Sequence, residues 1–179
     1  MCGILGTVPA TEYSQFKGAL DTLTHRGPDS FGIENIDDQV SLGHRRLSIL
    51  DISENGHQPM FHESRRYAVI FNGEIYNFLE IQKELENLGH RFRSTSDTEV
   101  LLKAYIQWGE ECVLKFNGMW ALAIWDTETK RLFMSRDRYG KKPLFYAQVN
   151  GKFIFASEMK AIFPFMDRLE VSDDFNWMK

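Results

Sequence analysis

The sequence predicts an α+β fold in which helices cover β-sheets. Short apolar runs typical of strands lie near both ends of the chain, and segments with helical periodicity lie between them. The 179 residues are 43% hydrophobic and 26% charged, with 14 Phe, 6 Tyr and 4 Trp, which is enough for a sizeable core. Because sheets and helices bury their apolar faces against one another, we expect a layered sandwich.

Strand and helix signals alternate along the first part of the chain. The apolar run at 2–8 (CGILGTV) predicts a strand, and residues 11–23 predict a helix with one apolar face. HRGPDS at 25–30 predicts a loop because of its Gly-Pro pair. Residues 40–50 predict an extended segment with a bend near Ser48.

A further strand and two helices are predicted in the middle of the chain. YAVIFNGEIYN at 67–77 predicts an apolar strand that runs into a turn at Asn72-Gly73, and residues 78–88 predict a helix. The second helix begins at Ser96, which forms a capping box with Glu99. The first helix is predicted to turn four residues inward: Phe78, Ile81, Leu85 and Leu88. Gly89 ends this helix and Gly109 ends the second one. A short helical turn is predicted to follow at 110–116.

From Gly118 onward the pattern changes to four short strand-like runs. They are WALAIWD, RLFMSRD, LFYAQV and KFIFAS, separated by turn signals. The Asn150-Gly151 pair between the last two runs predicts a hairpin. Ser157 is then placed to cap a last short helix at 158–162.

Composition and charge exclude several classes of function. The net charge is −4 without a basic block, so no nucleic-acid partner is expected. The chain has no signal peptide and no run approaching the roughly 20 apolar residues of a membrane helix, so we expect a cytoplasmic protein with no membrane partner. Cys2 and Cys112 are therefore expected to be free thiols. The five histidines are spread along the chain with no i, i+4 pair, so no metal is expected.

A cysteine directly follows the initiator methionine in MCGILG. If Met1 is removed, Cys2 carries a nucleophilic sulfur and a free α-amine on the same residue. A thiol has an ordinary pKa of about 8.5 and an α-amine one of about 7.7–8.0, so the amine can take the thiol proton near neutral pH. Position alone leaves an alternative open, in which Cys2 is only an early strand residue.

Acyl transfer by a thiol also needs donors for the negative oxygen that develops during attack. Asn72 offers a side-chain amide, and Gly73 offers a backbone N–H with no Cβ to block approach. Asn-Gly is equally a favoured turn dipeptide, as at Asn150-Gly151, so these two residues alone leave an ordinary turn as the alternative.

Eight segments occur in a fixed order along the chain: MCGILG, HRGPDS, LGHRRLSILD, FNGEIYN, STSDTEVLL, FNGMWALAIWD, RDRYGKKPLFY and FASEMKAI. Together they resemble the glutaminase domain of class II glutamine amidotransferases, in the branch of the glutamine-hydrolysing asparagine synthetases. The resemblance implies the N-terminal nucleophile hydrolase fold, a four-layer αββα sandwich of two antiparallel sheets. It also implies hydrolysis of the side-chain amide of free glutamine to glutamate and ammonia, through a thioester on the N-terminal cysteine.

The resemblance also implies a role for each matching position. Cys2 matches the nucleophile, with its α-amine as base, and Asn72 with Gly73 matches the oxyanion hole. Arg46 matches the group that binds the substrate α-carboxylate, for which a guanidinium fork is suited, while carboxylates suit the α-ammonium. The implied substrate-binding residues are Arg46, Leu47, Ile49, Leu50, Asn72, Gly73, Glu74 and Asp97.

Several of these positions have a purely structural alternative. Arg46 next to Arg45 could form a solvated basic pair, and Asp97 could simply begin a helix, where Asp is favoured. Cys112 is expected to be a small core residue. The lysine pair at 141–142 predicts a surface turn.

The resemblance implies a glutaminase domain at 1–167 and the start of a linker to a synthetase domain at 168–179. The Ser-Gly-Gly-x-Asp-Ser segment through which that second domain binds ATP does not occur in the sequence. No cofactor is therefore expected for the glutaminase half, and ATP and Mg are expected only in the missing domain. The expected partners are free glutamine and a synthetase domain or subunit, and apolar surface left bare without it would favour a homodimer. A non-catalytic glutamine-binding or scaffold module is the alternative function.

Overall fold

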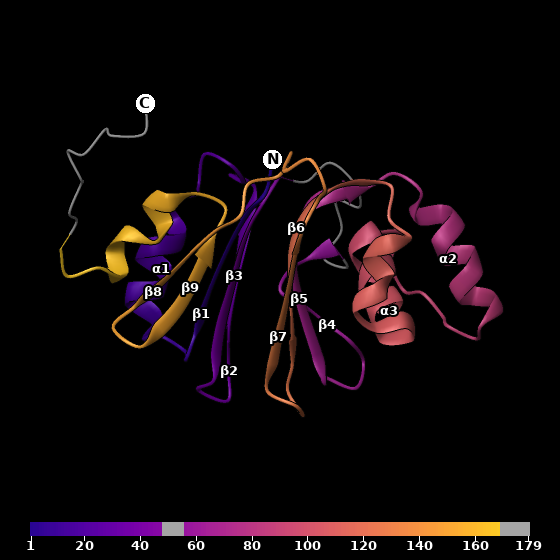
Figure 1. Cartoon of the computed structure of the whole chain (residues 1–179), viewed down its shortest axis with the longest axis horizontal. Coiled ribbons are helices and arrows are strands. Elements are labelled where there is room, and N and C mark those ends of the chain that lie inside the picture. Colours follow the sequence, from indigo (N-terminus) through magenta and orange to yellow (C-terminus); the bar gives the residue numbers. More distant parts are fainter. Residues whose placement is uncertain (48–55, 169–179) are drawn as a thin grey trace, which may run out of the picture.

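Two β-sheets pack face to face, and helices cover both outer sides (Figure 1). The structure is a computed structural model that describes residues 1–47 and 56–168. Within these residues, one sheet has five strands in the order β2-β3-β1-β9-β8 and the other has four in the order β4-β5-β6-β7, all paired antiparallel. The predicted α+β, four-layer αββα sandwich is confirmed.

The strands and helices have the following bounds. The strands are β1 (Gly3–Val8), β2 (Ser30–Ile36), β3 (Val40–Arg46), β4 (Met60–Phe61), β5 (Tyr67–Ile75), β6 (Gly118–Asp126), β7 (Arg131–Arg136), β8 (Phe145–Val149) and β9 (Lys152–Ala156). The helices are α1 (Tyr13–Asp21), α2 (Phe78–Asn87) and α3 (Asp97–Trp108), with short 3-10 helices η2 (Gly109–Leu114), η3 (Met159–Ala161) and η4 (Phe163–Phe165). No helix within residues 1–47 and 56–168 is long and apolar enough to cross a membrane.

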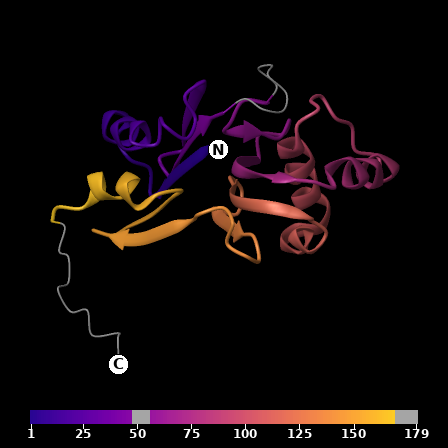
Figure 2. The same cartoon turned by 90° about the horizontal axis from the view of Figure 1, so that it is seen from above.

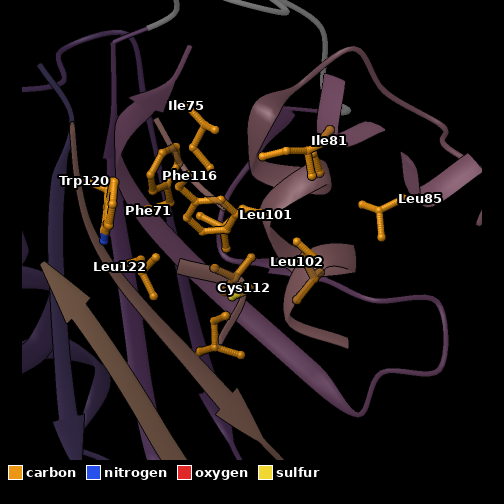
Figure 3. Packing of buried hydrophobic residues seen from close by; sticks show 14 residues of the cluster. Phe71, Ile75, Ile81, Leu85, Leu101, Leu102, Cys112, Phe116, Trp120 and Leu122 are labelled. Carbon is orange, nitrogen blue, oxygen red and sulfur yellow. The ribbon is translucent and has the colours of Figure 1, made fainter. Parts of the chain in front are cut away.

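Apolar cores fill the spaces between the four layers. The core between the two sheets includes Ile4, Leu42, Ile70, Ala123 and Phe155. The core between the five-stranded sheet and α1 includes Leu5, Phe16 and Leu20. The core between the four-stranded sheet and helices α2 and α3 includes Phe71, Ile81, Leu101, Cys112 and Trp120 (Figure 3). Successive residues of β1 and β5 thus enter different cores, as the alternation of side chains along a strand requires.

Most predicted elements are confirmed, and the differences lie at sheet edges and helix ends. The sequence did not indicate β2 or β4. Both strands lie at the edge of a sheet, and β2 is only partly buried, so neither has a clean alternation of apolar and polar residues. The Asn150-Gly151 hairpin is confirmed, with φ angles of 50° and 77° at these two residues.

The predicted turn at Asn72-Gly73 is wrong. Strand β5 continues through both residues to Ile75, and they pair with Ala121 and Trp120 of β6. Nine residues of β5 pair without interruption with β6, and this pairing imposes an extended backbone on a dipeptide that favours turns in isolation. Both residues therefore lie inside a sheet.

Three details of the helix ends also differ from the predictions. Leu88 is 53% exposed rather than inward. The capping box is only half formed, because Ser96 accepts from the backbone N–H of Thr98 at 3.1 Å but Glu99 binds a loop further upstream. Ser157 accepts from the backbone N–H of Ile4 at 2.9 Å instead of capping a helix.

Some predictions fall outside the described residues. These are the substrate-binding positions Ile49 and Leu50, the bend near Ser48, and residues 169–179 of the predicted linker. The domain boundary at 167 stays a prediction.

The burial of Cys112 leads to a testable difference between the two thiols. Cys112 is 1% exposed, and burial raises its pKa to about 12. Because thiols react as thiolates, we expect iodoacetamide at pH 8 to modify Cys2 alone in the folded chain and both cysteines after unfolding. Intact mass spectrometry measures this. Cys112→Ala is the control and should leave labelling of the folded chain unchanged, whereas two modified sites in the folded chain would contradict the buried placement.

Candidate active site

The N-terminus lies between the two sheets at one end of the sandwich (Figures 1 and 2). A cavity of about 300 Å³ opens there, a volume at the small end of ligand pockets and suited to a molecule the size of an amino acid. All sequence-predicted site residues that the structure describes line this cavity: Cys2, Arg46, Leu47, Asn72, Gly73, Glu74 and Asp97.

The pairing of β1 with β3 brings Cys2 and Arg46 to the same side of the five-stranded sheet. Ile4 of β1 faces the core between the sheets and pairs with His44 of β3. Side chains two positions apart on a strand point the same way. Cys2 and Arg46 therefore both point into the inter-sheet space, where the cavity lies.

The backbone of Cys2 is held from behind while its sulfur faces the cavity. Arg26 donates from Nε to the carbonyl oxygen of Cys2 at 2.9 Å, and it donates from Nη1 to Glu158 at 2.9 Å. On the other side, the Sγ atom lies 3.5 Å from the backbone nitrogen of Leu47 and 3.8 Å from its carbonyl oxygen. Cys2, the residue directly before β1, is thus fixed by side-chain and backbone contacts.

Asn72 approaches the cavity from the opposite sheet with an unsatisfied amide. Ile70 of β5 faces the inter-sheet core, so Asn72 points there as well, opposite the small side chain of Ala121. Asn72 is 1% exposed, and within the described part of the chain neither Nδ2 nor Oδ1 has a hydrogen-bond partner. Leaving such a group unpaired costs about 1–3 kcal/mol, which a bound ligand could recover.

Gly73 is required by the packing of β5 against β6. A Cβ at this position would collide with the carbonyl oxygen of Met119, the ring of Phe71 and the Cα of Trp120.

The carboxylate of Asp97 stands at the start of α3 and is nearly buried. Its Oδ2 accepts from the backbone N–H of Ile75 at 3.1 Å, which ties the helix start to the end of β5. Burial raises the pKa of Asp97 to about 6, and the charge of Glu74 adds to the effect. Within the described residues no cationic side chain pairs with this carboxylate, so an ammonium group of a ligand would complement it.

Comparison with known families identifies this arrangement. Residues 1–175 match the family model of the glutamine amidotransferase domain. The chain belongs to this family of amidotransferase domains. Among its relatives are asparagine synthetase [glutamine-hydrolyzing] 3 of Bacillus subtilis, 44% identical over 93% of this chain, and asparagine synthetase [glutamine-hydrolyzing] 3 of Arabidopsis thaliana, 39% identical over 90% of it. The chain spans 28% of the length of each of these relatives.

Solved structures support the fold of the amidotransferase domain independently. The glutamine phosphoribosylpyrophosphate amidotransferase of B. subtilis superposes with a TM-score of 0.76 at 22% identity, covering 90% of this chain and 43% of that chain. A structure described as the allosteric regulatory enzyme of purine biosynthesis gives a TM-score of 0.77, also at 22% identity, and covers 91% of this chain and 43% of that chain. The N-terminal nucleophile hydrolase fold implied by the sequence resemblance is thereby confirmed.

The residues of the amidotransferase domain that border the cavity without having been predicted as site residues include His44 and Gln58. His44 is buried, and burial lowers its pKa to about 3, so its ring is neutral near pH 7. Gln58 accepts from the backbone N–H of Phe71 at 2.6 Å and donates to Thr98 Oγ1 at 3.2 Å, which joins β5 to α3. His44 lies in the LGHRRLSILD segment, two residues before Arg46, which was a signal for its place, whereas Gln58 lies outside all eight segments and only the fold reveals its place.

The lysine pair at 141–142 was predicted as a surface turn, and this is wrong for one of its members. Lys141 is exposed, but Lys142 is only 6% exposed, and both residues border the cavity. The cavity of the amidotransferase domain therefore combines a thiol, an unpaired amide, cations and carboxylates. Within residues 1–47 and 56–168, no group of three or more His, Cys, Asp and Glu residues is placed to hold a metal ion.

The raised pKa of Asp97 predicts that this residue destabilises the free domain. A folded-state pKa of about 6, above the ordinary 3.8, means that Asp97 contributes stability below about pH 4 and that this is lost as the pH rises through 6. Asp97→Asn should therefore raise the free energy of unfolding at pH 8 by up to about 3 kcal/mol. Urea denaturation at pH 8 and pH 4 measures the difference.

The control for this variant is Asp38→Asn, which removes the same charge from an exposed position. It should leave the unfolding free energy nearly unchanged at both pH values. A destabilised Asp97→Asn variant at pH 8 would contradict the burial of an uncompensated carboxylate.

Proposed function

We propose that this domain hydrolyses the side-chain amide of free glutamine to glutamate and ammonia through a thioester on Cys2. The observation that carries the proposal is the unpaired, buried amide of Asn72, which borders the same cavity as the Cys2 thiol. A nucleophile and a preorganised donor on facing sheets are what acyl transfer needs.

In the proposed first step the α-amine of Cys2 takes the thiol proton, and the sulfur attacks the amide carbon of glutamine. The carbonyl oxygen becomes negative and accepts hydrogen bonds from the Asn72 side chain and the Gly73 backbone N–H. When the C–N bond breaks, the α-ammonium returns its proton to the leaving nitrogen, and ammonia departs. Water, deprotonated by the same amine, then attacks the thioester, which releases glutamate and restores the thiol.

This chemistry requires that Met1 be removed. While Met1 is attached, the nitrogen of Cys2 is part of a peptide bond and cannot act as a base. Met1 is 58% exposed and also borders the cavity, so it is accessible and its removal would widen the opening.

We further propose that both charged ends of glutamine are recognised. Arg46 is suited to the α-carboxylate as a guanidinium fork, and Asp97 with Glu74 is suited to the α-ammonium. Leu47 borders the same region of the cavity. Ile49 and Leu50 are proposed as neighbours from the resemblance alone.

The ammonia is proposed to serve an ATP-dependent amidation of a carboxylate, as the names of the relatives suggest. Those relatives are named glutamine-hydrolysing asparagine synthetases, and this chain spans 28% of the length of the first of them. A synthetase domain or subunit that holds ATP and Mg is therefore the proposed partner.

The test of the proposal is the rate of glutamate release from free glutamine, measured on protein whose intact mass shows that Met1 has been removed. We expect turnover, and we expect Cys2→Ala to abolish it because the attacking sulfur is lost. Cys112→Ala is the matched control, since it removes the other thiol of the chain from a buried position away from the cavity. It should retain activity.

Turnover by Cys2→Ala would contradict the proposed nucleophile. No turnover by the processed wild-type chain, with glutamine binding retained, would instead favour a non-catalytic glutamine-binding module.

Recognition of both charged ends predicts strong selection against blocked substrates. N-acetylglutamine lacks the ammonium, so Asp97 would remain buried without a partner. We expect kcat/KM to fall by about 100-fold or more relative to glutamine. Ammonia release measured with both compounds at pH 8 checks this, with glutamine added afterwards to confirm that the enzyme is still active. Equal rates with the two compounds would contradict the assigned substrate contacts.

A further inference from the structure

The loop after β7 is held in one conformation by two side chains. Asp137 accepts hydrogen bonds from four backbone N–H groups, those of Trp120, Tyr139, Lys141 and Lys142, at 2.9–3.2 Å. Arg136 donates to the carbonyl oxygens of Gly140 at 2.7 Å and Lys142 at 2.8 Å. Both backbone polar groups of Lys142 are therefore fixed, and the position from which its side chain starts is set before any ligand binds.

The side chain of Lys142 is buried against the cavity that contains Cys2 and Asn72. Within residues 1–47 and 56–168, its ammonium group has no hydrogen bond and no ion pair. Only 6% of Lys142 is exposed, and its ammonium is not among the fully enclosed polar atoms, so what remains accessible of this residue borders the cavity. An anionic ligand there would supply the partner that the ammonium lacks.

The other buried lysine among the described residues, Lys103, shows which partners a lysine with a structural role has in this fold. Lys103 is 4% exposed, and its ammonium lies 2.9 Å from Glu99 and donates to the carbonyl of Arg91. Lys142 has a similar degree of burial but lacks such partners. The difference points to a role in binding rather than in folding.

We propose that Lys142 is a carboxylate-binding residue of this cavity, and the inference rests on the proposed function, in which the cavity binds glutamine. The same cavity contains Asp97 and Glu74, so a ligand with a carboxylate and an attached ammonium fits it better than an anion alone. The carboxylate has two sources. One is the α-carboxylate, present in glutamine and glutamate, and the other is the γ-carboxylate, which exists only in the product glutamate.

The experiment is calorimetric titration of the full chain with glutamine and with glutamate, both at pH 8. The parent carries Cys2→Ala, so that no ligand is consumed, and Lys142→Met is added to it. The matched control is Lys83→Met, which removes the same charge from an exposed site on α2 outside the cavity. We expect Lys142→Met to weaken binding about tenfold or more, Lys142→Arg to keep most of it, and Lys83→Met to change nothing.

The pattern of losses identifies the carboxylate. Weaker binding of both ligands supports contact with the α-carboxylate, and weaker binding of glutamate alone supports contact with the γ-carboxylate. Unchanged binding of both overturns the role of Lys142 while leaving the proposed function standing. If the Cys2→Ala parent binds neither ligand, the proposed function fails first and the inference fails with it.

Thermal unfolding without ligand separates a binding defect from a folding defect. Because Lys142→Met removes an ammonium that has no partner within residues 1–47 and 56–168, its midpoint should be no lower than that of the parent. A clearly lower midpoint would contradict the claim that this ammonium has no structural role.

Discussion

The pairing of β1 inside the five-stranded sheet is the constraint on which the site depends. A terminal residue normally frays, because nothing holds it on one side. Here β1 lies between β3 and β9, and Ser157 exchanges two hydrogen bonds with Ile4, one through its hydroxyl and one through its backbone, both at 2.9 Å. Arg26 also donates a hydrogen bond to the carbonyl oxygen of Cys2 itself. Cys2, next to the chain end, thereby acquires the fixed geometry that its proposed role as nucleophile demands.

Three polar groups that border the cavity lack a complementary partner among the described residues. Counting partners only within residues 1–47 and 56–168, Asn72 has an unpaired amide, Asp97 has a carboxylate without a cation, and Lys142 has an ammonium without an anion. Elsewhere the same chain pairs its buried charges, as in the ion pair of Lys103 with Glu99. Polar groups that lack partners around a cavity, in a chain that pairs buried charges elsewhere, are the pattern expected where these groups are preorganised for a ligand.

The sequence predicts the parts of this structure that depend on local pattern. The apolar run of β1 and the face of α2 follow from periodicity, and the site residues follow from ordered motifs. The sequence does not predict the features that depend on contacts between residues far apart in the chain. The conformation of Asn72-Gly73 is set by β6, and the burial of Lys142 is set by the loop contacts of Asp137. Edge strands such as β2 carry a weak signal because only part of each is buried.

Two buried groups near the cavity give the domain opposing responses to acid. His44 has a pKa of about 3, below its ordinary value, so its stabilising contribution is present above about pH 6.5 and declines as the pH falls. Asp97 behaves in the opposite way, because its contribution is regained as the pH falls through about 6 toward 4. Over this window each shift is worth about 3 kcal/mol, so the two largely offset each other. The neutral imidazole of His44 and the carboxylate of Asp97 can therefore share one end of the sandwich with little combined effect on stability between about pH 6.5 and 4.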